Sequence, residues 1–375
     1  MSVQACAAAF FPWVATREPI TLGTSVRLLP FQVGRLPGDL PQATQADLDG
    51  ILGAYSDRPG VPVRCATIVE VDNWYTGIED SSVRPRLFRA RTAIGFAALA
   101  KRRLFESHLG YCCYDTYSLV VQRYKAAETG MFSFTTRRRD GSAGHLWGSD
   151  QFAFRRPLHV DERAPVDFDQ KLAQTLIEIP DDASKDLFEA LSEFNSANTD
   201  SQDVPPHVEV VMTKSAFEWL LGINQDANEF VRELQKCLPD PDIVDDGPLK
   251  EAWRKRFPKA RRPIEAWARE FCDLRGASAH GRNRDPSRFV WKRHVHLAFA
   301  SVLFPLIVKA KLAQAGNWTT TNSDAYKLAR IESYLIHDPF MHDSTATSES
   351  NPWSDLDSEA FIAQSAKKLW PGGSD

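Results

Sequence analysis

Residues 263–284, PIEAWAREFCDLRGASAHGRNR, decide how the second half of this chain of 375 residues is expected to fold. Pro263 suits the first position of an α-helix, where the missing N–H of proline costs nothing. Apolar and small residues then recur at steps of three and four, which predicts one buried stripe along a helix. The stripe consists of Ile264, Trp267, Phe271, Leu274 and Ser278. Gly281 is expected to end the helix, because glycine readily adopts the left-handed conformation of a C-terminal cap.

Arg275 and His280 stand beside this stripe on the predicted helix. The segment between them rises by about 7.5 Å and turns by roughly 140°, so the side chains do not stack, but both are long enough to converge on one phosphate. Histidine titrates near neutral pH and serves as a general acid or base, whereas arginine offers a permanent, forked cation. Gly276 costs roughly 1 kcal/mol relative to alanine inside a helix, which is unexpected in a purely structural helix.

A structural interpretation of the same residues stays open. His280 beside Gly281 would be favourable at the C-terminal end of a helix, where the helix dipole attracts positive charge. Arg275 would then form a surface ion pair with Asp273 or Glu270.

The run WAREFCDLRGASAHG, with Arg-x4-His and then glycine at the end of an amphipathic helix, resembles the HEPN signature, in particular that of the Apea-like HEPN group. The segments 194–201 (FNSANTDS) and 214–221 (KSAFEWLL) also resemble this group, and the similarity covers residues 183–337. The family often has Asn, Asp or His directly after the arginine, whereas this chain has Gly276.

The resemblance implies a metal-independent RNA endonuclease of the HEPN type, acting in anti-phage defence such as abortive infection, or as a toxin. Arg275 and His280 would be the catalytic residues. The residues expected to support them are Asp273, Gly276, Ser278 and Gly281. Those expected to bind RNA are Arg269, Arg282 and Arg284. HEPN proteins typically pair so that two Arg/His sets meet in one cleft, which implies a homodimer.

Two other classes of function remain open. One is a non-catalytic HEPN module that binds a protein partner or a nucleotide, with Gly276 marking the decay of the catalytic site. The other is a structural interaction protein in which the Arg-x4-His spacing arises by chance. Cleavage of RNA by the purified protein in the presence of EDTA would separate the nuclease from both.

The charge of the chain is unevenly distributed. The net charge is −4, yet residues 250–293 contain 14 Lys and Arg residues against 5 Asp and Glu residues. A basic segment around Arg275 and His280 would attract a polyanion such as RNA. A solvated helical surface, offset by acidic stretches elsewhere in the chain, accounts for the same charge, so both interpretations stay open.

Composition argues against membrane, disulfide-rich and metal-binding classes. No apolar run approaches the about 18 residues of a membrane span, and the N-terminus lacks the basic region of a signal peptide, so it is expected to remain as a first strand or turn. The 6 cysteines are scattered without a CxxC pair, which predicts reduced thiols and a cytoplasmic protein. Cys272 is expected to pack rather than react. The histidines form no ligand cluster, since His294 and His296 face different sides of one helix, so we expect no metal and no cofactor.

The N-terminal half has mixed patterns. Residues 1–165 are predicted to form an α+β domain. In the setting that the resemblance implies, this domain would sense a trigger, such as a phage component, or control pairing. Within it, residues 1–60 are interpreted as short strands and loops, 61–71 as one β-branched strand, and 86–106 as a helix.

The rest of the chain is predicted to be helical. A connecting helix is expected within 166–182, followed over 183–337 by an all-α HEPN-like helical bundle in which Ser184 is an N-cap. A long apolar helix over 288–314 is expected to be kinked by Pro305. Residues 338–375 read as an acidic, mostly mobile tail whose end has the pattern of a terminal helix.

Overall fold

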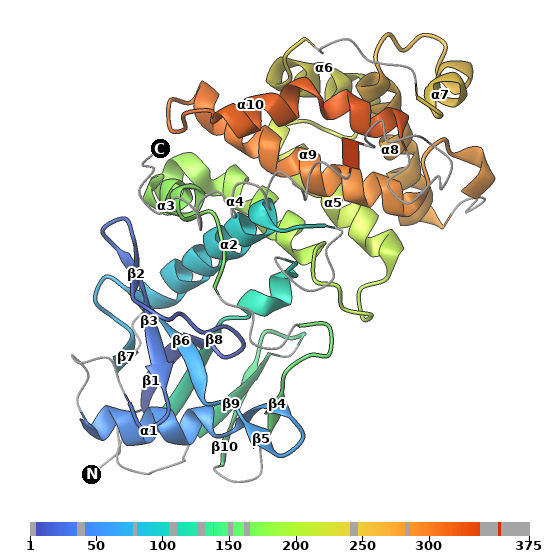
Figure 1. Cartoon of the computed structure of the whole chain (residues 1–375). Helices are drawn as coiled ribbons and strands as arrows, with labels where there is room; N and C mark the ends of the chain where they lie inside the picture. Colours follow the sequence, from blue (N-terminus) through green and yellow to red (C-terminus); the bar gives the residue numbers. More distant parts are fainter. Residues whose placement is uncertain are drawn as a thin grey trace. The chain divides into compact units, whose positions relative to one another are not determined.

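The computed structural model describes residues 5–35, 42–77, 81–104, 111–125, 132–137, 139–148, 153–160, 166–240, 247–281, 286–337 and 352–353. These residues form two compact units. The first takes in the described residues of 1–101, 112–180 and 199–201, and the second those of 102–111, 181–198 and 202–375. The first unit contains the β-sheet and the second is mostly helical, so the predicted α+β character of the N-terminal half and helical character of the C-terminal half are confirmed (Figure 1).

The main sheet of the first unit is antiparallel, with described strands in the order β10-β9-β8-β1-β6-β3-β2 and with β7 paired to β1. Its strands are β1 (Ala5–Phe11), β2 (Ile20–Leu22), β3 (Val26–Gln32), β6 (Cys65–Val71), β7 (Thr76–Gly77), β8 (Val120–Lys125), β9 (Phe132–Arg137) and β10 (Ala143–Gly148). A smaller sheet contains β11 (Phe154–Arg155), β4 (Tyr55–Arg58) and β5 (Val61–Pro62). The strand predicted over 61–71 was therefore wrong as one element: the chain breaks after Pro62, which cannot donate to a ladder.

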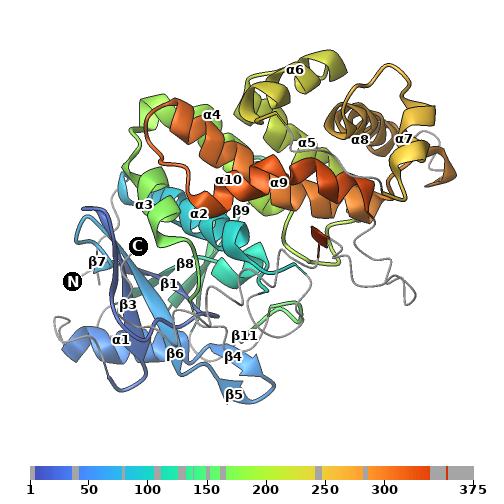
Figure 2. The same cartoon turned by 45° about the horizontal axis from the view of Figure 1, so that its top comes forward.

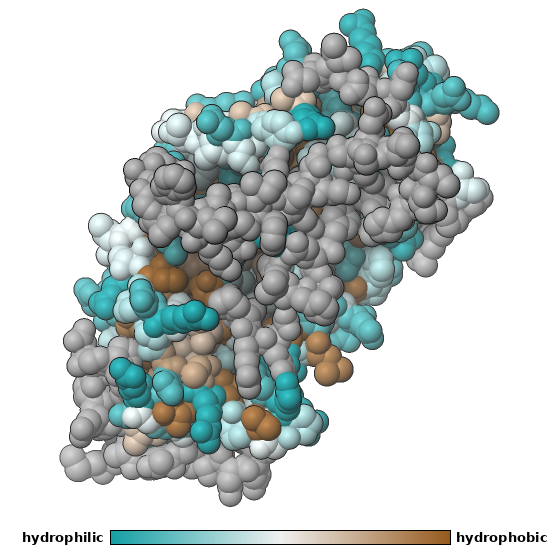
Figure 3. Space-filling model, in the orientation of Figure 1, coloured by the Kyte–Doolittle hydropathy of each residue, from teal (hydrophilic) through white to brown (hydrophobic). Residues whose placement is uncertain are grey.

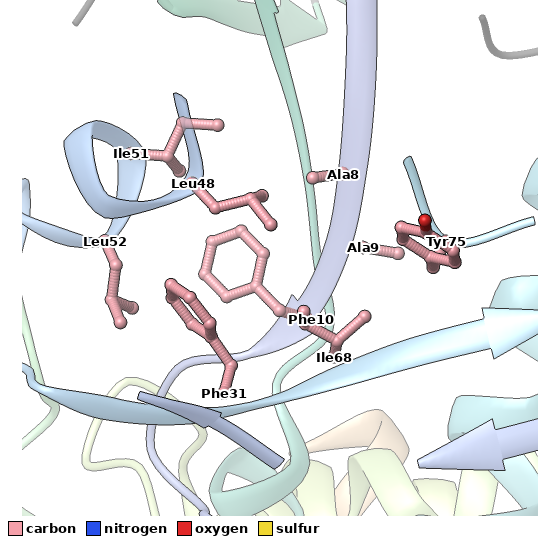
Figure 4. Close-up of a pocket in the computed structure, with 9 residues that line it drawn as sticks. All are labelled: Ala8, Ala9, Phe10, Phe31, Leu48, Ile51, Leu52, Ile68 and Tyr75. Atoms are coloured by element: carbon pink, nitrogen blue, oxygen red, sulfur yellow. The ribbon is translucent and has the colours of Figure 1, made fainter. Parts of the chain in front are cut away.

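One face of the main sheet packs against helix α1 (Gln42–Leu52), a helix that the sequence did not predict. Figure 4 shows Phe10 and Phe31 of the sheet directed toward Leu48, Ile51 and Leu52 of the helix. The cavity left between them measures only about 10 Å³, which is too small for a ligand. This part of the unit is therefore close-packed core rather than a binding site.

The opposite face of the sheet is covered by α2 (Val83–Lys101) and a 3₁₀ turn, η1 (Tyr114–Tyr117). The ring of Phe11 in β1 packs edge-on against Tyr117, with centroids 6.0 Å apart. Gly95 is required on α2, because an added Cβ would lie 2.5 Å from the ring of Tyr114. Helix α3 (Gln170–Glu178) lies where the connecting helix was expected, and Asp169 caps it by accepting a hydrogen bond from the Leu172 N–H at 3.0 Å.

The second unit contains the described helices α4 (Asp181–Ser196), α5 (Pro206–Leu221), α6 (Ala227–Cys237), α7 (Lys250–Arg256), α8 (Pro263–His280), α9 (Arg293–Gln314) and α10 (Asn322–Ala329), with the turns η2 (Pro286–Arg288) and η3 (Ile331–Ile336). The prediction that Ser184 is an N-cap was wrong, because α4 begins at Asp181 and Ser184 is buried within the helix. The long apolar helix begins at Arg293 rather than at residue 288, and Pro305 lies inside it.

Aromatic side chains form the core of the second unit. Trp267 of α8 stacks on Phe271 with centroids 5.0 Å apart and meets Phe299 of α9 edge-on at 4.7 Å. Phe217 of α5 packs edge-on against Phe304 of α9 at 5.1 Å. These contacts hold α8 between its neighbours, and Figure 2 looks roughly along α8 with α6 on one side and α7 on the other. The stripe predicted along α8 is therefore the buried face of the helix.

Two surface properties complete the unit. Hydrophilic residues gather over the α6 and α7 end in Figure 3, in keeping with the exposed basic residues of α7. Among the described residues, α9 alone is long and apolar enough to cross a membrane by length and composition, and 67% of its most apolar window is buried inside the protein.

Candidate active site on helix α8

Helix α8 begins and ends as the sequence predicts. Pro263 occupies the first turn, after an extended Arg262. Gly281 follows His280 with φ 63° and ψ 13°, which is the left-handed conformation that a glycine cap adopts at little cost. The cap places His280 as the last helical residue, and its side chain is exposed.

The fully buried carboxylate of Glu270 anchors α8 to the chain that follows it. Its Oε2 accepts a hydrogen bond from the Val290 N–H and its Oε1 accepts one from the Trp291 N–H, each at 2.9 Å. His296 Nε2 lies 3.3 Å from the same Oε1. Burial lowers the pKa of His296, so its ring is neutral in the folded protein and donates from Nε2. The segment before α9 is therefore fixed to α8.

Arg256 of α7 supplies the positive charge for this carboxylate. Its Nε lies 2.9 Å from Glu270 Oε2, and its Nη2 lies 3.9 Å from the exposed Asp273. The ion pair of Arg275 with Asp273 or Glu270, which the structural interpretation expected, is thus absent from the described part of the chain. Both carboxylates are already paired with a different arginine.

Arg275 is half-buried, and its Nε is buried without a hydrogen-bond partner among the described residues. A buried donor that is left unsatisfied costs free energy, so such a group in a folded protein calls for an explanation. Arg275 and His280 lie on one continuous helix, at the separation that the sequence predicts. The turn between them, roughly 140°, keeps the two side chains from stacking, and both are long enough to reach one phosphate beside the helix.

Gly276 faces open space, because a Cβ added to it would meet nothing within 4 Å. Packing among the described residues therefore gives no reason for glycine at that position. The other predicted supporting residues divide between two environments: Asp273 is exposed, whereas Ser278 is buried. Arg269, predicted to bind RNA, donates a hydrogen bond from Nη1 to Asn228 Oδ1 at 2.8 Å.

Arg282 and Arg284, also predicted to bind RNA, lie outside the described residues. The C-terminal tail that the sequence predicts is likewise outside them, apart from residues 352–353.

A pocket of about 290 Å³ opens on the other side of α8. Its described lining residues are His207, Leu274, Ala277, Ser278, Phe289, Trp291, Lys292, Arg293 and His294. Ser278 is only 8% exposed, and it makes no hydrogen bond within the described ranges. Arg293 Nε is buried and equally without a partner there. The pocket thus brings together two polar groups that lack a partner in the part of the chain that the structure describes.

The sequence does not reveal this pocket. His207 and His294 were expected to be isolated, because they lie far apart in the chain. They line the same pocket because α5 and the start of α9 both adjoin α8. The separation of His294 from His296 on one helix was correctly foreseen, since His296 is buried against Glu270 while His294 lines the pocket.

The cysteine next to the candidate residues is not activated. Burial raises the pKa of Cys272 to about 11, so its thiol is protonated at neutral pH. Within the described ranges, no group of three or more His, Cys, Asp or Glu side chains is placed to hold a metal ion.

Comparison of the chain with protein-family models, with curated proteins and with solved structures gives no match.

Proposed function

We propose that this protein is a metal-independent RNA endonuclease of the HEPN type, with Arg275 and His280 as its catalytic residues. The observation that carries the proposal is the state of Arg275. Its Nε is buried without a partner among the described residues, while the carboxylates nearest to it in sequence pair with Arg256. Because the side chain is only half-buried, a phosphate can approach the rest of this forked cation, which no described carboxylate neutralises. The exposed His280 on the same helix supplies an imidazole, the side chain that most often serves as a general base or acid.

The reaction requires a general base, a cation beside the phosphate and a general acid that protonates the leaving oxygen. His280 as general base removes the proton of a ribose 2′-hydroxyl, and the freed oxygen attacks the adjacent phosphorus. Arg275 stabilises the negative charge that develops on the phosphorane. The bond from phosphorus to the 5′-oxygen of the next nucleotide then breaks, and that oxygen receives a proton. The products are a 2′,3′-cyclic phosphate and a 5′-hydroxyl end.

A second copy of the chain completes this scheme. One α8 offers a single histidine, yet the reaction uses one group as base and one as acid. A two-fold axis beside the helix end would bring a second Arg275 and His280 to the same phosphate, and isologous dimers are the commonest symmetric assembly. By the resemblance to Apea-like HEPN proteins, we propose a cytoplasmic homodimer in anti-phage defence or a toxin-like role, with the first unit sensing the trigger.

The test is cleavage of single-stranded RNA by the purified full-length protein in the presence of EDTA. We expect cleavage of RNA, no cleavage of DNA of the same sequence because it lacks the attacking hydroxyl, and no cleavage by His280→Ala. The matched control is His337→Ala, which removes a histidine from another helix end of the same unit. Equal cleavage by His280→Ala and the parent protein would remove the assignment to this site.

A further inference from the structure

We infer that the pocket between α5, α8 and the start of α9 binds the phosphate group of a small phosphomonoester, such as a single nucleotide. This ligand site is separate from the proposed nuclease site. Helix α8 contributes Leu274, Ala277 and Ser278 to the pocket, whereas Arg275 and His280 are not among its described lining residues. His280 lies roughly 160° from Ser278, so it points away from the pocket.

The pocket contains donors that the described residues do not satisfy. Ser278 is more than nine-tenths buried and has no hydrogen-bond partner among the described residues, although its hydroxyl can both donate and accept. Arg293 Nε is buried and unpartnered within the same ranges. An anion in the pocket would accept a hydrogen bond from the Ser278 hydroxyl and would lie beside the positive charge of Arg293.

Two helix N-termini adjoin the pocket. His207 belongs to the first turn of α5, and Arg293 is the first residue of α9. Neither helix begins with a side-chain cap: the cap positions hold Pro205 and Lys292, whose side chains carry no oxygen. The first N–H groups of such helices carry partial positive charge and bind phosphate readily.

The charged and apolar parts of the lining fit the same ligand. Lys292 and Arg293 are basic side chains, and no carboxylate is among the described lining residues. Leu274, Ala277 and Phe289 provide an apolar wall for the carbon skeleton of the ligand. The volume of about 290 Å³ lies at the small end of ligand pockets, which favours one nucleotide or a sugar phosphate over a polynucleotide.

The pocket is also held in shape before any ligand arrives. Glu270 accepts hydrogen bonds from the Val290 and Trp291 N–H groups, and Trp291 Nε1 donates to the Leu335 carbonyl oxygen at 2.8 Å. The segment that carries Lys292 and Arg293 is therefore fixed against α8. A pre-formed site loses little ordering entropy when it binds.

The experiment is calorimetric titration of the full-length protein with adenosine 5′-monophosphate, ribose 5-phosphate, inorganic phosphate and adenosine. We expect both phosphomonoesters to bind saturably and adenosine not to bind. Binding of phosphate as tightly as of the esters would show that the anion alone is recognised. Absence of saturable binding for every phosphate-bearing compound, or equal affinity for adenosine and its monophosphate, would overturn the inference.

Variants assign the binding to these residues. Arg293→Gln should weaken binding by about tenfold or more, and Ser278→Ala by several-fold, because each removes a hydrogen bond to a charged group. Arg254→Gln removes one positive charge from the exposed surface of α7 and should change nothing. Circular dichroism checks that each variant folds, and Ser278→Ala keeps the test valid if Arg293→Gln does not. Unchanged affinity in both pocket variants would contradict the inference.

A last comparison separates this site from the nuclease site. His280→Ala should bind the monophosphate as well as the parent protein does, whether or not the protein cleaves RNA. If the affinity falls with His280 and not with Ser278 or Arg293, the ligand occupies the other face of α8 and the pocket assignment is wrong.

Discussion

Arg256 and Glu270 form an ion pair in which Nε and Oε2 are 2.9 Å apart and the carboxylate is 0% exposed. Glu270 also accepts hydrogen bonds from two backbone N–H groups, so one side chain links α7, α8 and the segment before α9. The stability of the helical unit and the shape of the pocket therefore depend on the same carboxylate.

Glu270→Ala should lower the free energy of unfolding of the helical unit by about 3–5 kcal/mol, because it leaves a partly buried arginine and two backbone donors without a partner. Asp273→Ala is the matched control on the same helix, since Asp273 is 51% exposed and 3.9 Å from Arg256. It should change stability by less than about 0.5 kcal/mol. Urea unfolding followed by tryptophan fluorescence measures both. Equal effects would show that Glu270 is not an anchor.

His296 should make the helical unit less stable in mild acid. Burial lowers its pKa below the ordinary value of 6.5, so the unfolded chain binds a proton before the folded protein does. The stability from neutral His296 is complete above about pH 6.5 and is lost as the pH falls from there toward the lowered folded pKa. Linkage places the effect in a window of roughly pH 7.5 to pH 5.5. In that window, His296→Gln, which keeps a donor but does not titrate, should lose less unfolding free energy than the parent protein loses. His337→Gln is the control, and an unchanged pH dependence in His296→Gln would refute the assignment.

Arg275→Lys should reduce the rate of RNA cleavage by about tenfold or more, because lysine keeps the charge but lacks the planar fork. Affinity for RNA should change little. Stability should change by less than about 0.5 kcal/mol, because Arg275 forms no ion pair with a described residue. Single-turnover cleavage and RNA titration separate the two effects, with Arg261→Lys as an exposed control. Full turnover in Arg275→Lys would mean that a point charge suffices there.

Gly276→Ala should raise the free energy of unfolding by up to about 1 kcal/mol, since alanine favours the helix and the added methyl meets nothing within 4 Å. Gly95→Ala should do the opposite, because its methyl would lie 2.5 Å from the ring of Tyr114. Thermal unfolding compares the two. If RNA or a second copy of the chain approaches α8 closely at Gly276, the same alanine will lower cleavage in a more stable protein. A destabilised Gly276→Ala would show that the glycine serves packing within the chain.

Mixing two inactive variants tests the proposed homodimer. Arg275→Ala and His280→Ala chains, each inactive alone, should recover part of the RNA cleavage when combined, because one composite site then draws arginine from one chain and histidine from the other. Light scattering of the parent protein should report a dimer. Repulsion between the basic segments should make its formation sensitive to salt. A fully active protein that stays monomeric at every concentration would exclude a shared site.

Local patterns in the sequence were sufficient to predict α8. Its proline start, its glycine end and the stripe from Ile264 to Ser278 all depend on residues within one segment. Helix α1 escaped prediction because its apolar residues, Leu48, Ile51 and Leu52, cluster in its second half and leave too few repeats to set a period.

The candidate site could be predicted only along one helix. The structural interpretation of the sequence offered Asp273 or Glu270 as a surface partner of Arg275, whereas Glu270 is buried against Arg256 and the segment before α9. Which carboxylate is buried depends on how α7 and α9 pack, and no pattern within α8 contains that information. The same limit hid the pocket, whose histidines come from α5 and α9.

The hydrogen bonds to Glu270 also determine where backbone amides exchange with solvent. The N–H groups of Val290 and Trp291 belong to no helix or strand, yet each is bonded at 2.9 Å to a carboxylate with no exposed surface. Amide hydrogens held in this way exchange only when the structure around them opens. Deuterium uptake should therefore be as slow at these two positions as in the middle of α8. The slowest-exchanging part of the helical unit then includes an irregular segment beside the phosphate pocket.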